Sequence, residues 1–143
     1  MRRGFSLIEL VLALVVTGLL AALSLPAIGA LHDRLRTDAA ARALVAAHLR
    51  ARFIALAEQR VVMLELTPAR LAIRAVESPV DTVLRWEGGG PAVEGVLVTG
   101  MPHQAAFGPA GIGLGLANAT FVLQRGGAAR QVIVSRYGRV RLQ

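Results

Sequence analysis

The sequence contains no cysteine and no lysine, and residues 95–143 contain no acidic residue. Without cysteine the chain cannot form a disulfide bond, and it has no thiolate for zinc binding or nucleophilic catalysis. All 16 basic side chains are arginine, whose planar guanidinium suits contacts to phosphate better than the ammonium of lysine does. Cysteine chemistry is therefore excluded, whereas recognition of an anionic partner is not.

The charge of the chain is unevenly distributed. Residues 32–94 hold nine arginines against eight acids, a net charge of +1, and residues 95–143 hold five arginines against none, a net charge of +5. Such an asymmetry favours an anionic partner for the C-terminal part, or it serves solubility alone. The composition leaves both alternatives open.

No set of catalytic or metal-binding residues can be read from the sequence. His32 and His48 lie 16 residues apart in a predicted helix, about 24 Å by helical rise, which is too far to share a metal ion. His103 stands alone in a glycine-rich segment. The nearby Gly111-Ile112-Gly113-Leu114-Gly115 lacks both the spacing of a dinucleotide-binding motif and the Lys-Ser/Thr ending of a phosphate-binding loop. We predict no enzymatic activity, no cofactor and no metal site.

The longest feature is an apolar run from Leu10 to Leu31, which holds 22 residues and no charged side chain. As a helix rising ~1.5 Å per residue it is about 33 Å long, enough to cross the ~30 Å hydrocarbon core of a membrane. The apolar core of a cleaved secretory signal is shorter, about 7 to 15 residues. Glu9 stands at the mouth of this run, and a lone carboxylate at membrane depth is a functional candidate because its burial is costly.

The N-terminus resembles the leader of type IV prepilins and of type II secretion pseudopilins. Two arginines precede Gly4, and Phe5-Ser6-Leu7-Ile8-Glu9 leads into the long apolar helix. The resemblance implies that a prepilin peptidase cleaves between Gly4 and Phe5 and that the new amine of Phe5 is N-methylated. It also implies a single-pass protein of the inner membrane, with its N-terminus in the cytoplasm and the rest in the periplasm.

The spacing of Phe5 and Glu9 has a physical rationale. After cleavage Phe5 would carry a free ammonium at the start of a helix, and Glu9 would lie one turn further, near the positive end of the helix dipole. In an assembled bundle, the ammonium of one subunit could pair with Glu9 of its neighbour, and each charge would offset the burial cost of the other. We therefore predict that Glu9 is a filament-assembly residue.

Apolar periodicity continues beyond the membrane-length run and predicts a helix over residues 32–59. Residues at steps of three or four form a stripe that we expect to pack on a β-sheet, namely Leu35, Ala39, Ala43, Ala46, Leu49, Phe53 and Ala57. Pro26 is predicted to kink the helix, because proline removes one backbone hydrogen bond and clashes with the preceding turn.

After Gln59 the pattern changes to that of β-strands separated by glycine and proline. A hairpin is predicted from Val61–Leu66 and Arg70–Val76, around Thr67-Pro68-Ala69, and a second from Ala119–Gln124 and Arg130–Arg136, around Gly126-Gly127. Further strands are expected at Thr82–Trp86 and Val93–Val98, and a loop with five glycines at Gly100–Asn118.

The C-terminal half resembles the GspH/FimT group of minor pseudopilins and minor pilins. The likeness lies in Phe107–Gly111, Thr120–Leu123, Arg130–Ser135 and Gly138–Leu142, and in the alanine-rich stretch Ala39–Gln59. It implies an α+β, pilin-like fold in which a long kinked N-terminal helix packs on an antiparallel sheet. The absence of a C-terminal cysteine pair departs from many major pilins.

This resemblance implies an organisation and a function. Residues 1–4 form the leader, 5–31 the transmembrane and filament-core helix, and 32–143 a periplasmic domain with a helix at 32–59 and a β-rich part at 60–143. The implied function is assembly with other pilins or pseudopilins into a type IV pilus or a type II secretion pseudopilus. A membrane-anchored periplasmic protein that joins no filament is the weaker alternative.

The C-terminal Gly138-Arg139-Val140-Arg141 is the one basic patch with a sharper interpretation. Residues two apart in a strand share a face, so Arg139 and Arg141 are expected to project together, with Arg130 and Arg136 nearby. Such a group could bracket DNA phosphates, and it resembles the DNA-binding tail of FimT-type minor pilins. The alternative is a solvated edge strand whose charges deter aggregation.

Overall fold

The computed structural model describes residues 6–100, 104–115 and 118–143, with the backbone alone for residues 23–25. The chain forms two compact units, Met1–His32 and Asp33–Gln143. The helix α1 (Leu7–Glu58) has 52 residues and is unbroken at Pro26, so the predicted kink stays a prediction. It ends at Glu58, and the next residue, Gln59, adopts a left-handed φ of 52°. The amide of Arg60 donates to the carbonyl of Ala55 at 3.3 Å and closes the last turn.

The helix face that packs on the sheets is opposite to the predicted one. The buried residues of α1 are Thr37, Ala40, Ala41, Leu44, Ala47, His48, Ala51 and Ala55, and every member of the predicted stripe is exposed. At ~100° per residue the two sets point in nearly opposite directions. The prediction of the packing face was wrong because both faces repeat alanine and other apolar residues at helical spacing, so the sequence pattern does not distinguish them.

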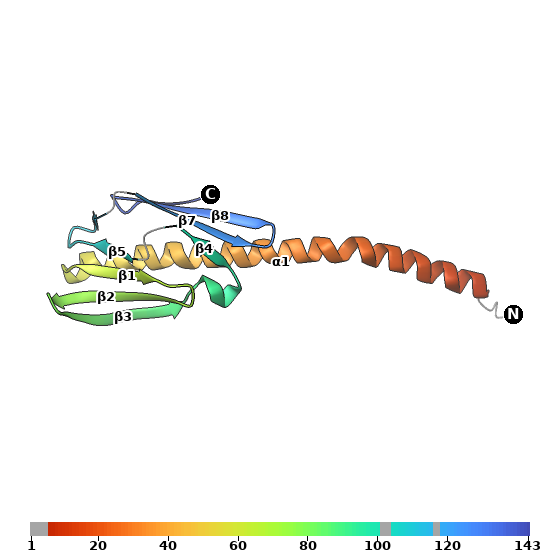
Figure 1. The fold of residues 1–143 in the computed structure, drawn as a ribbon, viewed down its shortest axis with the longest axis horizontal. Helices are drawn as coiled ribbons and strands as arrows, with labels where there is room; N and C mark the ends of the chain where they lie inside the picture. Colours follow the sequence, from red (N-terminus) through yellow and green to blue (C-terminus); the bar gives the residue numbers. More distant parts are fainter. Residues whose placement is uncertain (1–5, 101–103, 116–117) are drawn as a thin grey trace. The chain divides into compact units, whose positions relative to one another are not determined.

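The first sheet covers one side of the C-terminal half of α1 (Figure 1). It is antiparallel, in the order β3-β2-β1-β5-β6, and its strands are β1 (Val62–Leu66), β2 (Arg70–Ser78), β3 (Asp81–Gly89), β5 (Gln104–Phe107) and β6 (Gly113–Leu114). The predicted first hairpin is confirmed, with Leu66 opposite Leu71 across the turn. The predicted strand at Thr82–Trp86 lies within β3.

The second sheet is antiparallel, in the order β4-β7-β8-β9. Its strands are β4 (Leu97–Thr99), β7 (Asn118–Arg125), β8 (Ala128–Ser135) and β9 (Val140–Leu142). The predicted last hairpin is confirmed as β7 and β8. Gly126 has a positive φ of 53°, a conformation that glycine adopts without the steric cost of a side chain.

Two predicted segments differ in the structure. Instead of one strand at Val93–Val98, the 3-10 helix η1 (Pro91–Glu94) precedes β4, because Pro91 favours the first turn of a helix and Gly95, at φ 67°, ends it. The segment Gly100–Asn118, expected to be a loop, contributes β5 and β6 among its described residues. Short strands of alanine and glycine leave no clear alternating pattern in the sequence.

The core lies between α1 and the two sheets. Leu44 and His48 of α1 are buried at its centre, together with Phe107 of the first sheet and Phe121 of the second. The His48 ring lies 6.4 Å from the ring of Phe107 and 5.7 Å from that of Phe121, between centroids. The domain is therefore closed around the alanine-rich face of one helix.

Candidate functional site

The N-terminal motif is visible from Ser6 onward, and Gly4 and Phe5 lie outside the described residues. The backbone amide of Ser6 donates to Oε2 of Glu9 at 2.9 Å, and the amide of Ile8 donates to Oγ of Ser6 at 3.4 Å. This Ser-x-x-Glu arrangement follows the pattern of a capping box, which satisfies free amides at a helix N-terminus. The spacing of Ser6 and Glu9 in the sequence carries this capping signal, whereas the role predicted for Glu9 was in assembly alone.

Downstream of Glu9, the N-terminal part of α1 is apolar and uncovered. Its most apolar 18-residue window has a mean hydropathy of 2.4, none of the window is buried, and length and composition allow the helix to cross a membrane. Large side chains such as Leu12, Leu14 and Leu19 are more than 60% exposed. Because water would oppose such exposure, this surface requires lipid or protein around it.

The same helix keeps an apolar face uncovered inside the second unit. We call it the outer stripe; its members are Leu35, Ala39, Ala43, Ala46, Leu49, Phe53 and Ala57, all exposed. Phe53 is 69% exposed, Leu35 59% and Leu49 50%. Contiguous exposed apolar side chains mark a surface that binds a partner, so the stripe predicted to meet the chain's own sheet is available to another molecule.

Arg139 and Arg141 lie together at the C-terminus, as predicted. A turn brings the chain back to β9: Ser135 donates its amide to the carbonyl of Arg139 at 2.9 Å, and Arg139 donates its amide to Oγ of Ser135 at 3.2 Å. Both arginines line a surface hollow of about 380 Å³ with Ser135 and Tyr137, and neither forms a salt bridge with an acid of the described segments. Tyr137 is 76% exposed.

The other two predicted arginines differ from this pair. Arg130 is held by α1, because its Nε lies 2.6 Å from Oδ1 of Asp38. Arg136 is exposed in the turn before β9, and its backbone carbonyl accepts the amide of Gly113 at 2.9 Å. The hollow therefore brings Arg139 and Arg141 together, whereas Arg136 does not line it and Arg130 is paired with Asp38.

The described histidines are not gathered with other potential metal ligands. His48 is 2% exposed and its Nδ1 lies 2.9 Å from the carbonyl of Leu44. Burial lowers the pKa of His48 below its usual 6.5, against an opposing effect of the hydrogen bond to Leu44, so the ring is neutral in the folded domain at neutral pH. His103 lies outside the described residues, within which no group of three potential ligands gathers.

Comparisons with known proteins agree with the N-terminal motif and the fold described above. Residues 1–25 match the model of the prokaryotic N-terminal methylation motif. The chain is 33% identical over 156 aligned residues to the pilin-like protein PilA1 of Thermus thermophilus, with 99% of each chain covered. The chain belongs to the type IV pilin-like proteins. This likeness extends over the helix and both sheets, well beyond the N-terminal motif.

Solved structures show the fold of this type IV pilin-like protein independently. Two crystal structures of the type IV minor pilin FimU of Pseudomonas aeruginosa superpose with TM-scores of 0.66 and 0.62. They cover 77% and 74% of this chain and 90% and 91% of theirs, at 19% sequence identity. The predicted α+β pilin-like class, a long N-terminal helix on antiparallel sheets, is confirmed.

Proposed function

We propose that this type IV pilin-like protein is a minor pilin or minor pseudopilin that assembles with other pilins into a type IV pilus or a type II secretion pseudopilus. The outer stripe carries the proposal. A helix whose inner face is fully covered by its own sheets, and whose opposite face exposes Leu49 and Phe53, has a surface left over for a neighbouring subunit. Protein secretion or pilus biogenesis would follow from that assembly.

Glu9 supplies the specificity of the proposed assembly. In the single chain its carboxylate caps the helix by accepting from the Ser6 amide, so one oxygen is engaged and the other can accept from a neighbour's Phe5 ammonium. That ammonium forms only if the prepilin peptidase cleaves after Gly4 and N-methylation leaves it charged. A subunit would thus become competent to assemble through processing in the inner membrane, with its N-terminus on the cytoplasmic side.

The test is incorporation of variants into filaments in cells that carry the machinery. Glu9→Ala should remain in the membrane and be absent from sheared filaments, because the buried ammonium of its neighbour would lose its partner. Glu58→Ala is the matched control, since it removes a carboxylate elsewhere on α1 that pairs with Arg85 of its own chain. Equal incorporation of the Glu9→Ala and wild-type chains would overturn the proposal.

A second candidate function is DNA binding at the C-terminal patch during natural transformation. The observation that favours it is the lack of an acidic partner for Arg139 and Arg141 among the described residues, next to an exposed Tyr137. In the first sheet, by contrast, Arg70 lies within 4.0 Å of Glu65 and of Glu87. Guanidinium groups without a carboxylate partner are available to phosphate oxygens.

Binding of a labelled DNA duplex by the full chain in detergent, titrated against salt, separates this function from assembly. The Arg139→Ala/Arg141→Ala variant should lose affinity and about 1.8 units of the slope of log K against log salt, from two lost phosphate contacts. Arg70→Ala/Arg74→Ala removes the same charge from the first sheet and should change affinity less. No binding near ~50 mM salt, or equal loss in both variants, would exclude the DNA candidate.

A further inference from the structure

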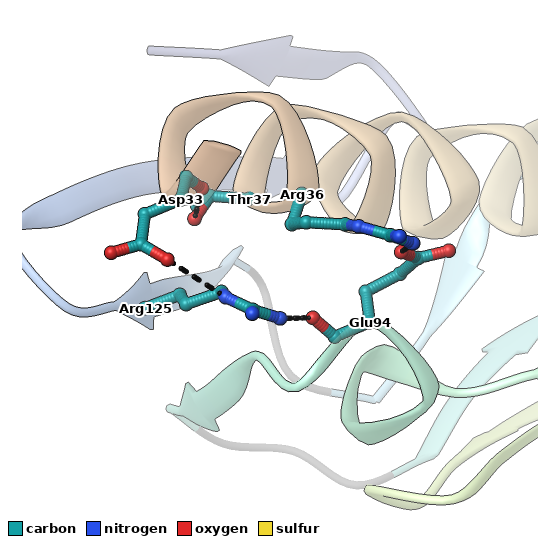
Figure 2. Close-up of polar contacts among 5 residues, drawn as sticks. All are labelled: Asp33, Arg36, Thr37, Glu94 and Arg125. Carbon is teal, nitrogen blue, oxygen red and sulfur yellow. Dashed lines mark hydrogen bonds and ion pairs between the residues drawn. The ribbon is translucent and has the colours of Figure 1, made fainter. Parts of the chain in front are cut away.

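Four charged residues join α1 to η1 and to β7 at the N-terminal end of the domain (Figure 2). Asp33 and Arg36 come from α1, Glu94 from the end of η1, and Arg125 from the end of β7. Nε of Arg125 donates to Oδ1 of Asp33 at 2.9 Å, and Nη1 of Arg125 donates to the backbone carbonyl of Glu94. The carboxylate of Glu94 in turn accepts from Nη1 of Arg36. With the backbone of α1, these contacts close a ring.

The backbone around this ring is shaped to let the side chains approach. A Cβ on Gly95, where φ is 67°, would collide with NH1 of Arg125, and a Cβ on Gly126, where φ is 53°, would collide with Oδ2 of Asp33. Two glycines with left-handed φ therefore lie next to Arg125 and Asp33, where a Cβ would meet these side chains. Beneath it, Thr37 is fully buried and donates its hydroxyl to the carbonyl of Asp33 at 2.8 Å.

The inner face of α1 needs such a device. Most of its buried members are alanines, such as Ala47, Ala51 and Ala55, which offer little shape to fix how the helix sits against the two sheets. Leu44 and His48 do so at the centre, but no large apolar side chain of the inner face lies before Leu44. Polar groups that pair in only one arrangement can specify register where apolar packing does not.

We infer that Arg125 is a positioning residue that couples η1 and the β7–β8 hairpin to α1. Together with Asp33, Arg36 and Glu94 it forms one cooperative cluster, which we call the latch. The carboxylate of Asp33 pairs with Arg125, and Arg36 pairs with Glu94. The fork of Arg125 connects the two pairs. The outer stripe begins at Leu35, between the two helix residues of the latch. If the outer stripe is the assembly surface, as proposed above, the latch fixes the border of the surface that a neighbouring subunit meets.

Amide hydrogen exchange of the full chain in detergent tests the coupling without any filament. Asp33→Asn should accelerate exchange of the amides of Gly95 and Val96 in the η1 segment, which Asp33 does not touch, by about tenfold, because loss of a hydrogen bond between charged groups releases Arg125 and with it η1. Both amides donate within η1, to the carbonyls of Ala92 and Pro91. Faster exchange in the η1 segment after a substitution in α1 would show that Arg125 couples the two elements.

Two variants separate the latch from ordinary stabilisation. Arg125→Lys keeps the charge but not the fork, so it should accelerate exchange in η1 as Asp33→Asn does. Asp38→Asn breaks the other ion pair between α1 and the second sheet, with Arg130, and should leave the η1 amides unchanged. The latch is refuted if Asp33→Asn affects the hairpin alone, or if Asp38→Asn accelerates η1 equally. Because no filament is measured, a failure of assembly would not imitate either result.

Discussion

The inner and outer faces of α1 within residues 33–143 are both rich in apolar residues, but the inner face is buried and the outer face is exposed. The inner face, centred on Leu44, Ala47 and Ala51, is almost completely covered by the chain's own sheets, whereas the outer face exposes Leu35, Leu49 and Phe53. Burial of apolar surface drives packing, and the larger side chains are those left uncovered. The difference shows that the chain covers one face of its helix with its own sheets and leaves the other face exposed, as the proposed assembly requires.

Substitution of Leu44 should show the largest difference in stability between the two faces. Leu44→Ala should lower the free energy of unfolding of the domain by about 2–5 kcal/mol, because it opens a cavity in a fully buried site. Leu49→Ala makes the same change on the outer face, where Leu49 is 50% exposed, and should cost well under 1 kcal/mol. Chemical denaturation of the two full-length variants in detergent measures both, and equal losses would contradict the assignment of the faces.

Replacing an alanine by leucine should give a smaller difference in stability between the two faces, again with the larger loss on the inner face. Ala51→Leu forces a larger side chain into a site with no exposed surface and should destabilise the domain by about 1–3 kcal/mol. Ala46→Leu adds the same atoms to the exposed face and should change stability by no more than about 0.5 kcal/mol. A destabilisation by Ala46→Leu as large as that by Ala51→Leu would show that the outer face is covered within the chain.

His48 makes the inner face sensitive to acid. Burial lowers its pKa in the folded chain below 6.5, so below pH 6.5 the unfolded chain binds a proton that the folded chain does not. The free energy of unfolding is therefore unaffected by the titration of His48 above pH 6.5, and it decreases progressively as the pH falls toward the lowered pKa. Denaturation curves at several pH values should show this loss in wild type and in the exposed-site control His32→Gln, but not in His48→Gln. A loss unchanged by His48→Gln would point to other groups.

The sequence predicted the parts of the fold whose signals are local. Alternation and turn residues identified both hairpins, and the prepilin-like leader identified the family that the relatives show. The packing face of α1 could not be read because two opposite faces both repeat apolar residues with helical spacing. The Arg125–Asp33 pair joins positions 92 residues apart, and no local pattern announces such a contact. The availability of Arg139 rather than Arg130 depends likewise on where Asp38 lies in space.

Filament assembly through the outer stripe can be measured most directly by site-specific cross-linking, since the chain has no cysteine of its own. A photoreactive maleimide would be attached to Phe53→Cys in cells that carry the filament machinery, with Thr82→Cys, an exposed position on β3, as the control. We expect adducts between the Phe53→Cys chain and other pilin-like subunits, and their loss when Glu9→Ala is added. Adducts that are absent, or that form equally well from Thr82→Cys, would contradict assembly through this face.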